Sequence, residues 1–109
     1  MYAQLTYFEA QSAEFAAAHD RAGRERIHPA IENDPQLRDE LVSVLVLSAP
    51  DGRRIVVSVM KSEAGLARAR EVIMSTELLP GEDPALLPGP DRIEVYQVAY
   101  AQTWTAVPA

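Results

Sequence analysis

His19 is the residue of this chain whose type and position are most suited to chemistry. It lies on the apolar stripe of a predicted helix, at helical spacing from Phe15 and Ala22. An unperturbed imidazole titrates near neutral pH, so His19 could act as a general base. The simpler interpretation is a histidine at the edge of the core whose ring nitrogens bind backbone or water.

Hydroxyl and amide groups on the predicted strands are the next candidates. Tyr7, Tyr96 and Tyr100 could present hydroxyls to a pocket or hold an oxyanion, although strand tyrosines more often belong to a core or an interface. Ser58 and Gln97 interrupt apolar strands. Because buried polar groups need partners, these two positions can mark a pocket or a water site.

Metal and cofactor signatures are weak in this sequence. His28 precedes Pro29 at the predicted end of the first helix, where a cation interacts favourably with the helix dipole, and the nearest carboxylate, Glu32, follows the proline. The chain has no cysteine, so thiolate metal sites and thiol nucleophiles are excluded. It also has no glycine-rich phosphate loop and no Gly-x-Ser-x-Gly motif. We therefore expect no metal and no bound cofactor.

Length and charge restrict the classes of protein and partner. The 109 residues suit a single domain over residues 1–109. A net charge of −6 disfavours nucleic acid as a partner, because like charges repel. The longest apolar run, 41–49, is shorter than the ~20 residues that span a bilayer. The start of the chain has no signal-peptide pattern, so we expect a cytoplasmic protein without membrane association.

Alternating and helical patterns predict four strands and two helices. Ser12 and Ser62 are candidate helix N-caps, Pro29 should end the first helix near His28, and Asp34-Pro35 can open a short extra turn. Pro50-Asp51-Gly52 predicts a tight turn. The expected elements are strand 2–8, helix 12–28, strand 41–48, strand 54–60, helix 62–77, loop 78–91, strand 92–102 and tail 102–109.

The proline-rich loop 78–91 is long for a compact domain, and such loops are often lids or binding loops. It carries Leu86 and Leu87, which we expect to pack over a ligand cleft or against a partner. Glu82 and Asp83 in the same loop are expected to be solvated. The tail contains Trp104, which we expect to extend the last strand and contact a second subunit.

The element order is that of an α+β, ferredoxin-like βαββαβ fold with two helices on one face of an antiparallel sheet. The predicted strands are apolar on both sides, whereas a sheet with one solvated face should alternate. In strand 41–48, for example, Leu45 and Leu47 fall on one side and Val44 and Val46 on the other. We therefore expect a homodimer whose sheets pack face to face.

The strand order, the hairpin Pro50-Asp51-Gly52-Arg53-Arg54 and the helix start Met60-Lys61-Ser62-Glu63-Ala64 resemble the dimeric α/β-barrel superfamily. The resemblance covers residues 1 to about 101 and is nearest to the antibiotic-biosynthesis-monooxygenase-like branch. Met60 stands where members commonly carry tryptophan. The haem-degrading members use an Asn, Trp and His set that this chain lacks.

The resemblance implies a small apolar or aromatic ligand between helices and sheet, facing His19. It further implies a cofactor-independent monooxygenase acting on a phenol or quinol. On that interpretation His19 is the base, Tyr7 or Tyr96 the donor, and Ser58, Gln97, Tyr100, Leu86 and Leu87 contact the substrate. A ligand-binding or regulatory dimer without catalysis, and a structural accessory protein, remain alternatives.

Overall fold

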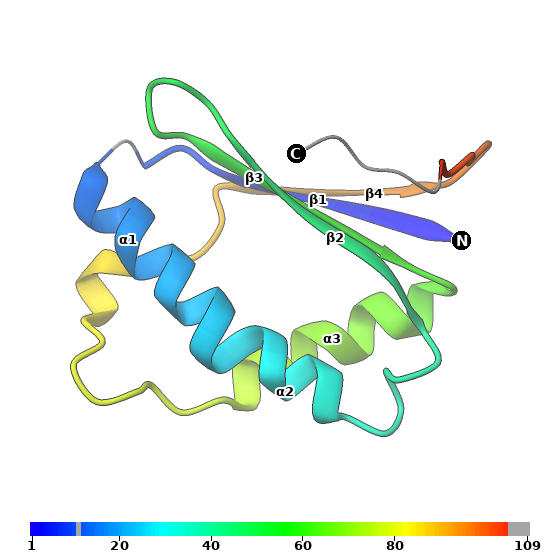
Figure 1. Ribbon diagram of the computed structural model, residues 1–109, viewed down its shortest axis with the longest axis horizontal. Helices are drawn as coiled ribbons and strands as arrows, with labels where there is room; N and C mark the ends of the chain where they lie inside the picture. The colour runs from blue at the N-terminus through cyan, green and yellow to red at the C-terminus, as the bar shows by residue number, and fades with distance from the viewer. Residues whose placement is uncertain (11, 105–109) are drawn as a thin grey trace.

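An antiparallel sheet with helices on one face forms the body of the protein (Figure 1). The computed structural model describes residues 1–10 and 12–104. The sheet has four strands in the order β2-β3-β1-β4, so β1 and β3 are central. The predicted α+β class is confirmed, and the arrangement is compatible with a ferredoxin-like fold. The strands are β1 (Tyr2–Phe8), β2 (Leu41–Ser48), β3 (Arg54–Met60) and β4 (Arg92–Gln97).

The strand register determines which side chains face the helices. Gln4 is opposite Ser58, and Tyr7 is opposite Ile55. Directly opposed residues point to the same face of a sheet, and successive residues alternate. Gln4 and Ser58 therefore share the helix-covered face, whereas Tyr7 and Ile55 share the other face, which we call the open face.

The first helical segment continues through the predicted stop at Pro29. It runs as α1 (Ala13–Ala22), the π-helical segment η1 (Gly23–Ile27) and α2 (His28–Asn33), in one line from blue to cyan in Figure 1. Proline in a normal α-helix collides with the carbonyl four residues earlier. Here the His28 N–H binds the Gly23 carbonyl, five residues back, and this wider turn accommodates Pro29. The predicted helix end at His28 was therefore wrong.

The predicted helix starts are confirmed. Ser12 Oγ accepts a hydrogen bond from the Phe15 N–H at 3.0 Å, and Ser62 Oγ accepts one from Gly65 at 3.1 Å. Ser62 caps α3 (Glu63–Ser75), which ends two residues before the predicted boundary. Residues after Asp34 form turns rather than an extra helix.

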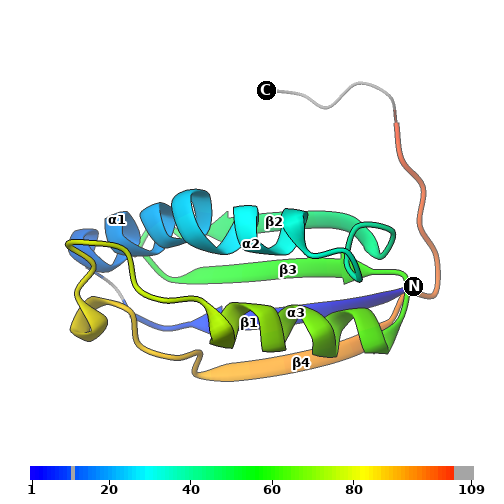
Figure 2. The same ribbon diagram turned by 90° about the horizontal axis from the view of Figure 1, so that it is seen from below.

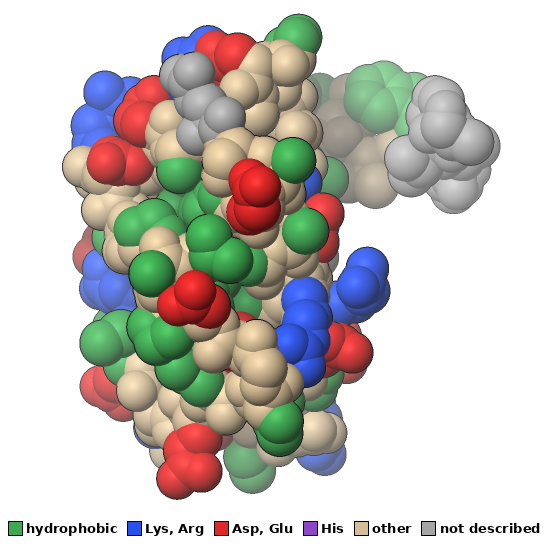
Figure 3. All heavy atoms as spheres, turned by 90° about the vertical axis from the view of Figure 1, so that its left-hand side faces the viewer, with side chains coloured by type: hydrophobic (Ala, Val, Ile, Leu, Met, Phe, Trp, Pro, Cys, Tyr) green, Lys and Arg blue, Asp and Glu red, His purple; other side chains and the backbone are tan. Residues whose placement is uncertain are grey.

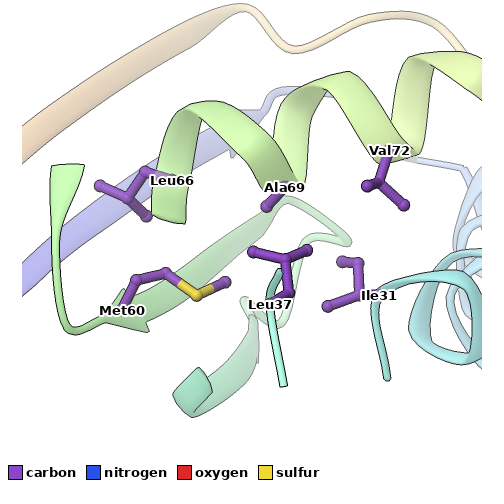
Figure 4. Close-up of a cluster of buried hydrophobic side chains, with 6 residues drawn as sticks. All are labelled: Ile31, Leu37, Met60, Leu66, Ala69 and Val72. Atoms are coloured by element: carbon purple, nitrogen blue, oxygen red, sulfur yellow. The ribbon is translucent and has the colours of Figure 1, made fainter. Parts of the chain in front are cut away.

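The core lies where α2 and α3 pack over the sheet. Its buried side chains come from α2, the following turn, β3 and α3 (Figure 4). Leu37 and Met60 are the largest fully buried side chains, at 0% and 1% exposed. The cluster consists of Ile31, Leu37, Met60, Leu66, Ala69 and Val72. Burial of these side chains anchors one end of the helix layer.

The loop between α3 and β4 is tied to the first helix by polar contacts. It contains the short 3₁₀ helix η2 (Pro84–Leu86), which packs against α1. Glu82 is not solvated as expected, because its side chain is 3% exposed and pairs with Arg26 at 2.8 Å. The Arg26 Nη1 also donates to Thr76 Oγ1 at 2.7 Å. The loop is therefore held against η1.

The last strand is shorter than predicted. β4 ends at Gln97, although the Val98 N–H still donates to the Met1 carbonyl at 2.9 Å. Residues 98–104 then run away from the body of the molecule (Figure 2). The predicted strand through Gln102 was thus wrong, and Trp104 does not extend it. Residues 105–109 of the predicted tail lie outside the described residues.

Candidate functional site

A cavity of about 560 Å³ lies between the helices and the sheet. Two helical arms, the segment α1–η1–α2 and the helix α3, lie side by side across the sheet (Figure 2). The cavity is lined by residues from both arms and from all four strands. This volume suits a small organic ligand. The apolar lining comprises Phe8, Ile27, Val46, Val56, Ile73, Met74, Pro90 and Ile93.

The floor of the cavity carries a polar group of three side chains: Gln4, Thr6 and Ser58. Gln4 Nε2 makes a long contact of 3.4 Å with Thr6 Oγ1. Gln4 is 8% exposed, and its Oε1 is buried without a hydrogen-bond partner among the described residues. A buried amide oxygen without a partner is unfavourable, so this floor favours a ligand that brings a donor.

His19 lines the cavity from α1, between two aromatic rings. Its ring centroid is 4.7 Å from that of Phe8 and 5.4 Å from that of Phe15, with which it stacks. Burial lowers the pKa of His19 below its ordinary value of 6.5, and the positive charge of Arg54 lowers it further. The imidazole is therefore neutral at pH 7 and can accept a proton.

His28 also lines the cavity, which the sequence interpretation did not foresee. The π-helical turn brings its ring beside Gly23, where an added Cβ would lie 3.6 Å from Cε1. A positive charge on His28 would lower the pKa of His19, so the two side chains are close enough to interact. The sequence interpretation ended the helix at Pro29. The π turn tolerates this proline, so His28 stays within the helix.

One carboxylate, Asp20, belongs to the lining, and it is paired. Arg54 binds it with two nitrogens, one of them at 3.2 Å, and the guanidinium is nearly buried. This hydrogen bond lowers the pKa of Asp20. The Arg54 Nε has no partner among the described residues. The pair fixes the start of β3 to α1 and neutralises the negative charge next to His19.

Two predicted site residues lie on the other side of the sheet from His19. Tyr7 pairs in register with Arg92, and Tyr96 with Ala3, all on the open face. The Arg92 guanidinium lies 4.0 Å from the centre of the Tyr7 ring. The Tyr96 hydroxyl donates to Glu94 at 3.1 Å. His19, Tyr7 and Tyr96 therefore do not meet in one site within a subunit, because strand alternation separates them.

The remaining predicted contacts are dispersed. Ser58 lines the cavity, but Gln97, Tyr100, Leu86 and Leu87 are not among its lining residues. Gln97 is exposed near the end of β4, and the hydroxyl of Tyr100 donates to Gln102. Leu86 and Leu87 are half-buried, and η2, which contains Leu86, lies beside α1. The proline-rich loop contributes Pro90 to the lining of the cavity instead.

Two further features concern the surface. A smaller hollow of about 300 Å³ adjoins the cavity and shares His28 and Val46 with it.

On the end of the molecule shown in Figure 3, basic side chains are interspersed with acidic ones and form no continuous patch in the described part.

The described residues contain neither a metal-binding cluster nor a membrane-spanning helix. No group of three or more His, Asp or Glu side chains there could hold a metal ion. None of the described helices is both long and apolar enough to traverse a bilayer.

No protein-family model and no curated protein matches this chain.

Proposed function

We propose that the cavity between helices and sheet binds a small phenolic or quinol-type molecule and that the protein oxidises it with O₂ without a bound cofactor. The observation that carries this proposal is the neutral imidazole of His19, set in an apolar cavity above a polar floor. An apolar wall holds an aromatic ring, and the floor offers hydrogen bonds to its hydroxyl. The resemblance noted above points to the same chemistry.

In the proposed reaction His19 accepts the proton of the substrate hydroxyl. The electron-rich anion then reacts with O₂. The substrate loses two hydrogen atoms and gains one oxygen atom, and the second oxygen atom leaves as water. No external reductant is needed, because the substrate supplies all four electrons.

The lowered pKa of His19 limits which substrates can react. A simple phenol has a pKa near 10, so proton transfer to a group with a pKa below 6.5 costs at least about 5 kcal/mol before any other stabilisation. Donors on the floor, such as the Ser58 and Thr6 hydroxyls, can offset part of this cost. Phenols and quinols whose hydroxyls are more acidic than that of simple phenol are therefore the preferred substrates.

Oxygen consumption by the purified protein tests this function. We expect a panel of quinols and polyphenols to be turned over in air and not under nitrogen. His19→Ala should reduce turnover by at least about a hundredfold, the lower range for a general base. Arg38→Gln, an exposed change away from the cavity, is the matched control and should retain activity. Equal turnover by His19→Ala and wild type would refute the role of His19.

A second candidate is a binding protein without catalysis. A general base usually needs a partner that orients its ring, and none of the side-chain hydrogen bonds of the described residues involves the ring of His19. Its ring is positioned instead by stacking on Phe15. Saturable ligand binding without oxygen uptake, unaffected by air or nitrogen, would favour this candidate.

We further propose that the protein is a homodimer formed through the open face of the sheet. Leu45, Leu47 and Tyr96 are 55%, 46% and 54% exposed there, although large apolar side chains prefer burial. Their neighbours Leu5, Val57 and Val59 are only half-buried. A second copy packed face to face would cover this surface and would also offer contacts to Trp104.

A further inference from the structure

Arg24 and Arg70 differ from most arginines of this protein. Six arginines form ion pairs with carboxylates, namely Arg21, Arg26, Arg53, Arg54, Arg68 and Arg92. Arg24, Arg38 and Arg70 have no ion pair among the described residues. Two of these three, Arg24 and Arg70, line the same cavity.

The two arginines come from two different helical segments of the lining. Arg24 lies in η1 and Arg70 in α3, and both are exposed, so their charges lie toward the solvent side of the cavity. The polar floor belongs to the sheet, and His19 lies on α1. The cavity therefore has an anion-attracting rim above an apolar middle and a hydrogen-bonding floor.

The charge balance of the lining is unusual for this protein. The chain has a net charge of −6, yet its cavity is lined by two unpaired cations and a single carboxylate. That carboxylate, Asp20, is already bound by Arg54, and His19 is neutral at pH 7. Two positive charges thus remain for a ligand, and an acidic protein would otherwise repel an anion.

We propose that the ligand is an aromatic hydroxy acid, whose carboxylate binds Arg24 and Arg70 while its hydroxyl reaches the floor of the cavity. Guanidinium groups recognise carboxylates through paired hydrogen bonds, and two of them from separate helices fix the orientation of the ligand. The orientation places the hydroxyl end next to His19. This inference rests on the proposed function and narrows its substrate class from phenols to phenolic acids.

The test compares an acid with its neutral amide. Isothermal titration calorimetry of the full chain should measure the dissociation constants of para-hydroxycinnamate and para-hydroxycinnamamide at neutral pH. We expect the acid to bind about tenfold more tightly than the amide to the wild type. In the double variant Arg24→Gln, Arg70→Gln this preference should vanish, with the affinity for the amide unchanged. Arg38→Gln should keep the wild-type preference.

The outcomes separate this inference from the proposed function. Val56→Phe fills the cavity and should abolish binding of both compounds. If the amide binds and the acid shows no preference, or if the double variant keeps the preference, the role of the arginines is overturned while the cavity remains a binding site. If neither compound binds, or if Val56→Phe binds both normally, the cavity proposal fails and this inference fails with it.

Discussion

Arg26 and Glu82 form an ion pair that is almost buried, with Nε and Oε1 2.8 Å apart. Arg26 belongs to the π-helical segment and Glu82 to the proline-rich loop, so a single contact joins segments 56 residues apart. Glu82 accepts two further hydrogen bonds, from Arg26 Nη2 at 3.3 Å and from the Leu79 N–H at 2.7 Å. The loop is therefore shaped by one carboxylate that has three donors.

Glu82→Ala should destabilise the protein by about 2 to 3 kcal/mol, because it leaves the Arg26 guanidinium buried without its partner. Urea unfolding followed by circular dichroism measures this loss. Asp83→Ala changes a neighbouring acid whose hydrogen bond is local and exposed, so it should cost far less. Equal losses in the two variants would show that the ion pair contributes nothing special.

The same pair predicts acid sensitivity. The hydrogen bond from Arg26 lowers the pKa of Glu82 below its ordinary value of 4.5. The stability from this shift is present above the unfolded pKa and is lost as the pH falls through the folded pKa. The free energy of unfolding should therefore drop below about pH 4.5, and Glu82→Gln should show a shallower drop. Parallel profiles in both proteins would contradict this.

His19 predicts a second pH effect with its own window. Its folded pKa lies below 6.5, so the unfolded state binds more protons between the two values. Stability should be full above the unfolded pKa and should fall as the pH decreases from it toward the folded pKa. NMR titration of the His19 ring protons measures the folded value directly. His19→Phe, which keeps an aromatic ring, should remove this dependence, and a folded pKa above 6.5 would refute the prediction.

Gly65 in α3 should not tolerate alanine, although alanine favours helices. An added Cβ would lie 2.8 Å from Glu40 Oε2 and 3.2 Å from its Cβ. Glu40 cannot move freely, because its carboxylate accepts hydrogen bonds from the Ser62 N–H and hydroxyl. We expect Gly65→Ala to cost about 1 kcal/mol in thermal or urea unfolding. Gly89→Ala meets no atom within 4 Å and should be neutral. A stabilised Gly65→Ala would show that Glu40 yields.

The proposed dimer can be broken on the open face. Leu45→Glu should convert dimer to monomer in sedimentation velocity at micromolar concentration, because a second copy would bury that carboxylate. Leu78→Glu places the same charge on an exposed leucine of the α3–β4 loop and should leave the dimer intact. A wild type that sediments as a monomer at this concentration would refute the dimer itself.

Local chemistry made several features predictable from the residues alone. Ser12 and Ser62 cap helices because their hydroxyls satisfy nearby N–H groups, a short-range effect. Strand positions followed from apolar runs between turn residues. Pro29 misled the prediction because its effect depends on the local hydrogen-bond pattern, which the π turn of η1 changes. His28 was misjudged for the same reason.

The sequence by itself determined the α+β class, the four strands and the helix starts, because these depend on patterns within a few residues. Only the tertiary structure decided which groups meet. Tyr7 and His19 both carry polar groups suited to catalysis, but the register of β1 with β3 turns Tyr7 to the open face. Gln4, by contrast, faces the cavity that His19 and Arg70 line from two helices. Which side chains share a site depends on strand register and on helix packing between distant segments, and no local sequence pattern encodes these.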